Sequence, residues 1–242
     1  MDNIQPIWDQ RVLLCHDAIV VADIHIGYEY ELEKKGYIIP SQTKKLMDTV
    51  SGILKETGVR RLIINGDLKH NVPTGSWQEY KEIPKVMDHW LKYVDEIHLI
   101  KGNHDGGIEG YLPHEVIVHG STGTVIDGIG YFHGHGHPSE EVVQAEMIVT
   151  AHSHPTVQLK DGLNRNESYP CWVRFKFSKD DSVGEGILMP TLNSLLGGIN
   201  ITKGNYLGPF FKRYEIWDEK IYLLDGTCLG TREGLPNSEE SV

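Results

Sequence analysis

The sequence has little cysteine and no long apolar run. Its three cysteines, Cys15, Cys171 and Cys228, are far apart and form no CxxC pair. This spacing argues against both a disulfide framework and a thiolate zinc site. We therefore expect the thiols to be small buried side chains in a protein of the reducing cytoplasm. No stretch approaches the roughly 18–20 apolar residues of a membrane-spanning helix, and residues 1–6 lack the basic and apolar segments of a signal peptide, so we expect no membrane association.

Positive charge is also scarce. Lysine and arginine number 23 against 34 aspartates and glutamates, which gives a formal net charge of -11. This balance argues against the broadly cationic surface that binds nucleic acid through many phosphate contacts. It does not exclude a nuclease, because bound divalent metal ions add positive charge where a substrate phosphate must lie. What the chain does have is 13 histidines, and their positions are informative.

The length of 242 residues suits one domain over residues 1–242. The first half alternates apolar strand-like runs with amphipathic stretches, which is typical of βαβ units. We expect strands at residues 11–14, 18–24, 61–65 and 96–100. We expect one helix at 41–57, capped by Ser41 and ended by Gly58, and a second at 77–94, where Pro84 either kinks it or begins a new helix.

The second half is richer in strands. The pattern predicts strands at residues 116–119, 124–126, 129–133 and 147–151, a tight hairpin at Asp127-Gly128 and a short helix at 139–146 capped by Ser139. A β-rich part at 155–229 is expected to hold strands 172–177, 186–189, 214–217 and 221–224. The polar tail, 230–242, is expected to fray. The predicted class is α/β, with mixed sheets packed together and helices outside.

Five short motifs contain the residue types of a catalytic site. Four directly follow an apolar strand run and His133 closes the fifth, so their side chains should converge on one sheet edge. An i, i+2 spacing in an extended segment lets both members of a pair point the same way. The motifs are Asp23-Ile24-His25, Gly66-Asp67, Gly102-Asn103-His104-Asp105, His133-Gly134 and His152-Ser153-His154.

These residue types suit hydrolysis of a phosphate ester. Two metal ions roughly 3.5–4 Å apart acidify a bound water, whose hydroxide is the nucleophile, and clamp the attacking and leaving oxygens. Mixed His, Asp and Asn ligands without thiolate suit Mn²⁺, Fe²⁺, Zn²⁺ or Ni²⁺. One carboxylate must bridge the pair. A DxH, Gly-Asp or HxH motif alone is more often a surface turn or a structural pair, whereas Gly-Asn-His-Asp is the sharpest single motif. All five in order, each at a strand end, favour a site.

The order DxH, GD, GNHD, H, HxH resembles the calcineurin-like metallophosphoesterase superfamily over roughly residues 18–155. The resemblance implies a four-layer α-β-β-α fold, a mixed β-sandwich flanked by helices, with a dinuclear site at one edge. It places Asp23, His25 and His154 on the first metal ion. It places Asn103, His133 and His152 on the second, with Asp67 as the bridge.

The same resemblance assigns two catalytic residues. His104 would protonate the leaving oxygen or stabilise the transition state, and Asp105 would orient it. The last family motif is usually GHxH, but Ala151 stands here in place of glycine. The fourth ligand has three candidates, His133, His135 and His137; the family pattern favours His133, and leaves His135 to contact substrate or lie on the surface.

Within the superfamily, residues 66–70 and Pro73 resemble the GDLFH segment of SbcD-type DNA nucleases. With Pro190 and Gly197-Gly198 included, the pattern is most similar to archaeal SbcD-related phosphoesterases, which are similar to bacterial ligase-associated DNA-repair endonucleases. The resemblance gives Lys69 and His70 the role of substrate-phosphate contacts, with solvated loop residues as the alternative. It also makes DNA or RNA the expected substrate, Mn²⁺ the first expected metal, and a homodimer or DNA-repair proteins the candidate partners.

Three functions stay open at this point. The first is a phosphodiesterase or nuclease, favoured by the Gly66–His70 pattern. The second is a phosphomonoesterase or small-nucleotide hydrolase, favoured by the acidic net charge. The third is a non-catalytic binding module on the same fold, against which the complete ligand set and His104 both argue.

Overall fold

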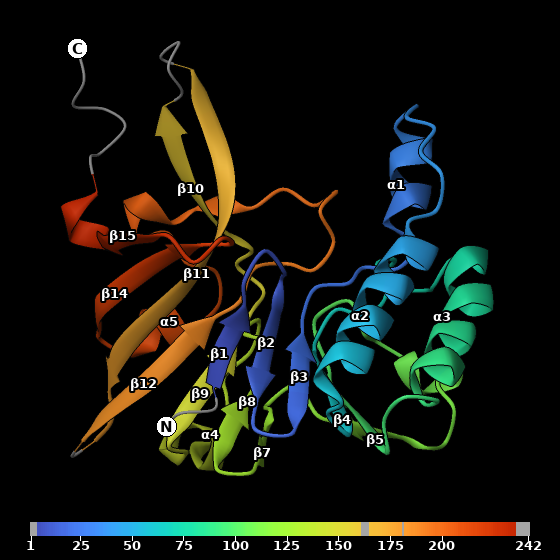
Figure 1. Cartoon of the computed structure of the whole chain (residues 1–242), viewed down its shortest axis with the longest axis horizontal. Coiled ribbons are helices and arrows are strands. Elements are labelled where there is room, and N and C mark those ends of the chain that lie inside the picture. Colours follow the sequence, from blue (N-terminus) through green and yellow to red (C-terminus); the bar gives the residue numbers. More distant parts are fainter. Residues whose placement is uncertain (1–3, 161–164, 181, 236–242) are drawn as a thin grey trace.

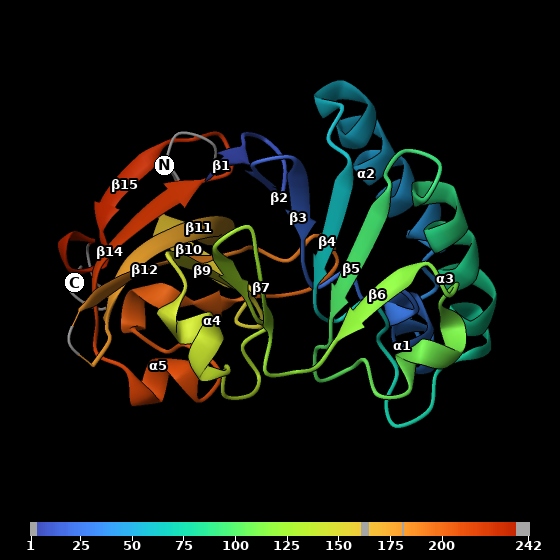
Figure 2. The same ribbon diagram turned by 90° about the horizontal axis from the view of Figure 1, so that it is seen from below.

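The computed structural model describes residues 4–160, 165–180 and 182–235. Two β-sheets stand face to face, and helices cover the outer side of each (Figures 1 and 2). The layers run helix, sheet, sheet, helix, which confirms the predicted four-layer α/β class. No helix within the described ranges is long and apolar enough to span a bilayer.

The first sheet has strand order β1-β2-β3-β4-β5-β6. Strands β3 to β6 run parallel; at one side β2 pairs antiparallel with β3, and β1 pairs antiparallel with β2. All the parallel strands therefore end at the same edge. The strands are β1 Ile4–Ile7, β2 Val12–Cys15, β3 Ala18–Val21, β4 Arg61–Asn65, β5 Glu96–Ile100 and β6 Val116–His119.

The second sheet has the order β13-β10-β11-β12-β9-β8-β7, and β14 and β15 extend it from β11. Strands β8, β9 and β12 are parallel to one another, and β11 runs antiparallel to β10, β12 and β14. The strands are β7 Thr124–Ile126, β8 Ile129–Tyr131, β9 Met147–Thr150, β10 Pro155–Lys160, β11 Asn166–Ser178, β12 Val183–Leu188, β13 Ile199–Asn200, β14 Ile216–Leu223 and β15 Cys228–Thr231.

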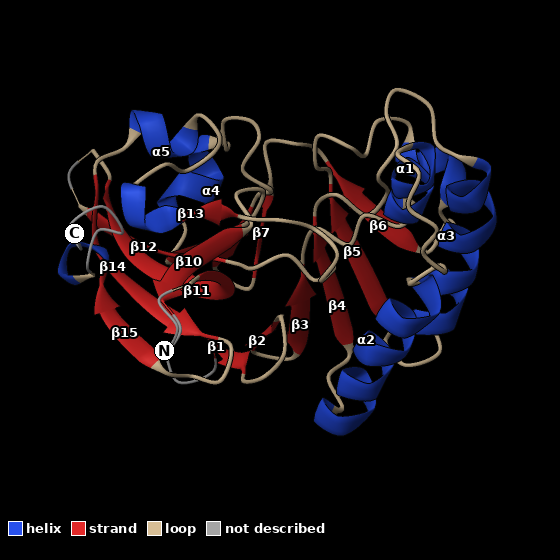
Figure 3. Ribbon diagram, turned by 90° about the horizontal axis from the view of Figure 1, so that it is seen from above, coloured by secondary structure: helices blue, strands red, loops and turns tan. Residues whose placement is uncertain are grey.

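The helices lie on the outside (Figure 3). Helices α1, α2 and α3 cover the first sheet, while α4 and α5 lie against the second. The α-helices are α1 Tyr28–Lys34, α2 Thr43–Thr57, α3 Trp77–Trp90, α4 Glu140–Gln144 and α5 Phe210–Arg213, and short 3₁₀ turns occur at Ile108–Tyr111, Ile201–Lys203 and Arg232–Gly234.

Strand alternation divides the core into three layers. Ile19 and Val21 of β3 face the helices α2 and α3, whereas Ala18 and Val20 face the second sheet. Side chains alternate in the same way in the second sheet, where Val149 of β9 faces the first sheet. Because successive strand side chains point to opposite faces, a strand buried on both sides reads as continuously apolar.

Several local predictions are confirmed. The strands at Glu96–Ile100, Val116–His119 and Thr124–Ile126 have the predicted bounds. Asp127 and Gly128 both have positive φ, 50° and 80°, as a tight two-residue hairpin requires. Gly58 ends α2 in the left-handed conformation, and the Ser139 side chain accepts the Val142 N–H at the start of α4.

Other predictions are wrong in detail. Ser41 is not the N-cap residue of α2, which is Gln42; the Ser41 hydroxyl oxygen accepts the Thr43 N–H at 3.3 Å, and the hydroxyl donates to Glu82. Helix α3 continues through Pro84, so no new helix begins there. The predicted strands 214–217 and 221–224 are one strand, β14. Of the polar tail, residues 236–242 lie outside the described ranges.

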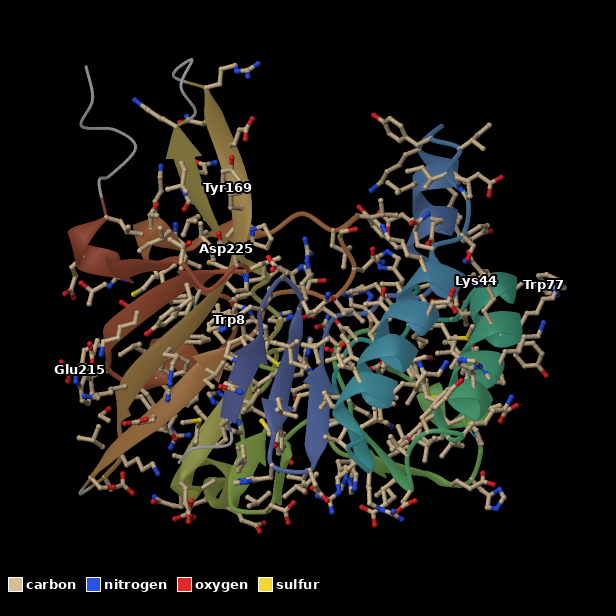
Figure 4. The ribbon with its side chains drawn as sticks, viewed as in Figure 1. Trp8, Lys44, Trp77, Tyr169, Glu215 and Asp225 are labelled. Atoms are coloured by element: carbon tan, nitrogen blue, oxygen red, sulfur yellow. The ribbon has the colours of Figure 1, made fainter. Side chains whose placement is uncertain are left out.

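Exposure differs among the cysteines and among the tryptophans. Cys15 and Cys171 are buried as expected, but Cys228 is exposed. Trp90 and Trp172 are buried, whereas Trp77 is 75% exposed and projects from the outer end of α3 (Figure 4).

Candidate metal centre

The predicted motifs meet at one edge of the sandwich. Asp23, Asp67 and Asn103 follow β3, β4 and β5, while His133 and His152 follow β8 and β9. In each sheet these residues follow the carboxyl ends of neighbouring parallel strands. Side chains from both sheets therefore lie at the same edge of the sandwich. The His152 N–H donates to Asp23 Oδ2 at 3.3 Å, which joins the two sheets directly.

The backbone of this edge is strained at the predicted ligands. Left-handed φ values between 43° and 68° occur at five predicted ligand positions. Such values are uncommon for residues with a side chain and cost energy unless the surroundings enforce them. Strain at these positions is an independent sign of a functional site. The residues are Asp23, His25, Asp67, His152 and His154.

Within the described residues, three groups of side chains place their potential ligand atoms within 4.8 Å of one another. One consists of His25, His70 and His104, and the two that contain a carboxylate are called the first and the second group. The first group is Asp23, His25 and His154, in which Asp23 Oδ1 lies 3.0 Å from His154 Nε2. The second is Asp67, His133 and His152. Each of these two groups has one carboxylate and two imidazoles, a donor set that suits a borderline divalent ion.

The Asp67 carboxylate lies between the two groups. Its Oδ2 is 3.4 Å from His25 Nε2 in the first group and 3.2 Å from His133 Nε2 in the second. One oxygen thus faces ligand atoms of both groups. This is the arrangement expected of a bridging carboxylate in a two-metal site.

Two ring nitrogens in this centre have no hydrogen-bond partner among the described residues. His25 Nε2 and His133 Nε2 are both buried and make no hydrogen bond, although each lies within 3.4 Å of Asp67 Oδ2. The His133 ring is fixed from its other side, where Nδ1 donates to the Asn65 carbonyl at 3.0 Å. A buried polar atom without a partner is costly, and a metal ion would satisfy both nitrogens. The residues present therefore fit two divalent ions.

The charges of the centre favour a cation. Burial alone would raise the pKa of Asp67. The attraction of the nearby His133 and His25 rings is larger and holds this pKa below its usual range. Burial lowers the pKa of His133, but Asp67 and Asp23 outweigh it and raise the pKa to about 9. Burial lowers the pKa of His152 to about 4, so this ring is neutral and can act as a ligand. The buried carboxylates thus attract positive charge.

The Asn103 and His104 side chains lie at the open side of the centre. Both line a cavity of about 330 Å³, together with His25, Asp67 and His154. Asn103 is exposed, and the His104 ring lies edge-on to His25, with the ring centres 4.8 Å apart.

The His104 ring is held by its backbone and by one ring nitrogen. The His104 N–H donates to Asp67 Oδ1 at 2.8 Å, and Nδ1 donates to the carbonyl of His70. Asp105 does not make the predicted contact with this ring. Its buried carboxylate accepts the backbone N–H groups of Asp67 at 2.7 Å and Gly102 at 2.8 Å. Asp105 therefore ties the Asp67 loop to the Gly102 loop.

The two predicted substrate contacts from residues 66–70, Lys69 and His70, are both buried. Lys69 is fully buried, and its Nζ donates to the Asn71 carbonyl at 2.6 Å. His70 is buried too, with Nδ1 3.1 Å from His25 Nδ1 and Nε2 on the Glu31 carboxylate. In this conformation neither presents a cation to the cavity.

The fourth motif offers three histidines in different surroundings. His133 lies in the second group, and His137 is exposed. His135 is half-buried, with its ring centre 5.4 Å from that of His133 and 6.1 Å from that of His152. The geometry therefore favours His133 as the ligand and leaves His135 at the rim.

Several contacts at this centre were missed at the sequence level. Thr191 Oγ1 donates to the Asp23 carbonyl at 2.8 Å, and Asn193 Nδ2 donates to the Ile24 carbonyl at 3.1 Å. Both lie about 170 residues further along the chain. Glu31, which holds His70, lies in helix α1, which the pattern did not predict. No local motif marks these residues, so only the fold reveals their role.

Comparison with known proteins gives a family match. A model of the calcineurin-like phosphoesterase family matches residues 17–181. No curated protein matches the chain. Among solved structures, the nuclease MPE of Pseudomonas putida is 20% identical with a TM-score of 0.58, covering 94% of this chain and 100% of that one. Yfce, a phosphoesterase from E. coli, is 16% identical with a TM-score of 0.44, covering 88% of this chain and 96% of that one. At 20% identity, the similarity to the nuclease MPE shows a shared fold.

Proposed function

The chain belongs to the calcineurin-like phosphoesterase family, and from this membership we propose that it cuts phosphodiester bonds of nucleic acid at the centre around Asp67. The family supplies the broader statement that the protein is a metal-dependent phosphoester hydrolase. The nucleic-acid substrate and the roles of single residues are our proposal.

One observation carries the proposal. The Asp67 Oδ2 atom lies within 3.4 Å of His25 Nε2 and 3.2 Å of His133 Nε2, so one carboxylate oxygen can serve two ions. Asp23, His25 and His154 would hold the first ion. Asn103, His133 and His152 would hold the second. Two such ions, with Mn²⁺ the first expected, supply a nucleophile from water at neutral pH and neutralise charge on the phosphoryl oxygens.

We assign the transfer of a proton to His104. The His70 carbonyl can only accept a hydrogen bond, so His104 Nδ1 carries a proton in the observed contact. Nε2 is then the nitrogen that can exchange a proton with a substrate in the cavity, which His104 lines. This geometry supports protonation of the leaving oxygen as its task.

Two features support a polymeric diester over a small monoester. Residues 66–70 have the Gly-Asp-Leu-Lys-His pattern similar to SbcD-type nucleases, and we propose the archaeal SbcD-related phosphoesterases as the most similar group. In addition, α1 and the β10–β11 hairpin rise on either side beyond the edge where β3 ends (Figure 1). A long substrate can lie across an edge flanked in this way.

The test compares three substrates with protein stripped of metal and reloaded with Mn²⁺. A bis-aryl phosphate, an aryl monophosphate and single-stranded DNA are offered to the wild type and to His104→Ala. We expect diester and DNA turnover, and a loss of 10²-fold or more in His104→Ala, as for a general acid. His114→Ala is the matched control, because His114 is exposed and its ion-pair partner among the described residues is Glu115.

The competing functions give different results. Faster turnover of the monoester than of either diester would overturn the proposed substrate and favour a phosphomonoesterase, in keeping with the net charge of -11. Two bound ions without turnover of any substrate would favour a non-catalytic binding module.

A further inference from the structure

A second, smaller cavity adjoins the metal centre. Its volume is about 170 Å³, and it shares His154, Gly197 and Gly198 with the larger cavity. The two cavities therefore lie next to each other at His154 and Gly197-Gly198. The smaller cavity also contains Arg11, which belongs to none of the motifs that define the metal centre.

The fold places Arg11 at the catalytic edge. Strand β2 runs antiparallel to β3, with Leu13 opposite Val20. Arg11, just before β2, therefore lies beside the carboxyl end of β3, and Asp23 follows that end. Its Nη1 donates to the Thr191 carbonyl at 3.0 Å. Because Thr191 also donates to the Asp23 carbonyl, the guanidinium has a fixed position relative to the first metal ligand.

Arg11 is a half-buried cation that forms no ion pair within the part of the chain described. Four other arginines, Arg60, Arg61, Arg174 and Arg232, each pair with a carboxylate. Burial lowers the pKa of the Arg11 guanidinium. A partly desolvated charge without a counter-ion is unfavourable, so this position is costly unless an anion fills it.

The rest of the cavity is suited to an anion. In a chain of net charge -11, none of its lining residues is acidic. Thr156, Ser168 and Ser194 are among its lining residues, and Thr156 Oγ1 is buried without a hydrogen-bond partner among the described residues. A guanidinium surrounded by hydroxyl donors is the usual means of binding a phosphate.

We propose that the Arg11 cavity binds a second phosphate of the substrate, next to the one hydrolysed at the metal centre. This inference rests on the proposed phosphodiesterase function and adds a specificity site to it. A substrate with two neighbouring phosphates, such as a nucleotide chain, occupies both cavities at once. A diester with a single phosphate occupies only the larger one.

The test uses two substrates with the same scissile bond. The p-nitrophenyl ester of thymidine 5′-phosphate has one phosphate, and the corresponding ester of thymidine 3′,5′-bisphosphate has a second. With Mn²⁺-loaded wild type we expect a KM about tenfold lower for the bisphosphate ester, since a charge-assisted hydrogen bond contributes about this factor. Arg11→Gln is expected to bring the ratio of the two KM values close to one.

Two further variants guard against indirect effects. Arg60→Gln is the matched control, because Arg60 is exposed and lies at the opposite edge, before β4 begins; it should keep the preference. Ser168→Glu adds a carboxylate to the cavity at an exposed position and should remove the preference even if Arg11→Gln does not fold. Thermal melting and metal content show whether each variant is folded.

The outcomes separate this inference from the proposed function. Equal KM values for the two esters in the wild type overturn the second-phosphate site while the function stands. The same holds if Arg11→Gln affects both esters alike. If neither ester is hydrolysed, calorimetric titration of the Mn²⁺-loaded protein with thymidine 3′,5′-bisphosphate and with thymidine 5′-phosphate decides. Tighter binding of the bisphosphate, lost in Arg11→Gln, supports the site, and equal binding overturns it.

Discussion

His25, His70 and Glu31 form a series of hydrogen bonds. If His25 Nε2 binds a metal ion, only one distribution of the ring protons is consistent with these bonds. His25 Nδ1 must then carry the ring proton and donate it to His70 Nδ1, 3.1 Å away. His70 accepts there, so its own proton lies on Nε2 and is donated to Glu31. The His70 hydrogen bond, followed by that of Lys35, lowers the pKa of Glu31 to about 2, which keeps the acceptor ionised.

This arrangement predicts that Glu31 positions a metal ligand without touching the metal. In Glu31→Ala, His70 loses its anchor and His25 its fixed orientation, so affinity for the first ion should fall about tenfold, as for other outer partners of ligating histidines. Competition with a chromophoric chelator measures this fall directly. Glu33→Ala, on an exposed position of the same helix, should leave the affinity unchanged; an unchanged affinity in Glu31→Ala as well would contradict the role.

At the scale of single elements, the sequence predicted what is encoded locally. Strand β3 was recognisable because it is apolar on both faces, and the β7–β8 hairpin because Asp-Gly suits left-handed turn positions. Helix α1 was missed because it has seven residues, a glycine at its start without a side-chain cap, and Glu29 as its one buried residue. Such a helix has no apolar stripe to detect.

The metal centre shows the same division. The convergence of Asp23, Asp67 and His133 was predictable because strand ends and residue types mark them. The positions of Glu31 and Arg11 beside them were not, because they depend on which segments the fold brings together. The predicted orientation of His104 by Asp105 failed for a related reason. Neighbours in sequence at a tight turn point to different partners, and Asp105 turns to the backbone of the Asp67 loop.

Helix α2 offers two glycines that test the role of backbone conformation. Gly58 ends the helix at φ 65°, while Gly52 lies within the helix, and neither has another atom within 4 Å of an added Cβ. Gly58→Ala should lower the free energy of unfolding by about 1 kcal/mol, because alanine is strained in the left-handed region. Gly52→Ala should raise it by about 0.5–1 kcal/mol. Urea unfolding curves measure both, and a shift of equal sign in the two variants would refute this explanation.

At the scale of the whole molecule, the metal centre joins the two sheets. Asp23 and Asp67 come from the first sheet, whereas His133, His152 and His154 come from the second. Bound ions should therefore cross-link the halves of the sandwich and also neutralise two buried carboxylates. A ligand that binds only the folded state stabilises it by about 2.7 kcal/mol at 100 times its dissociation constant. We expect a higher melting temperature with Mn²⁺ than after removal of metal with a chelator.

Two variants show whether this stabilisation comes from the proposed ions. Asp67→Asn keeps a residue type that tolerates positive φ but removes the bridging charge, so it should lower the content of both ions and abolish most of the Mn²⁺-dependent shift. His104→Ala lies in the same cavity but removes no proposed ligand, so it should keep both ions and the full shift. Melting curves paired with metal analysis give both quantities. Loss of a single ion in Asp67→Asn would show that Asp67 is not the bridge, and loss of an ion in His104→Ala would make His104 a ligand instead of a proton donor.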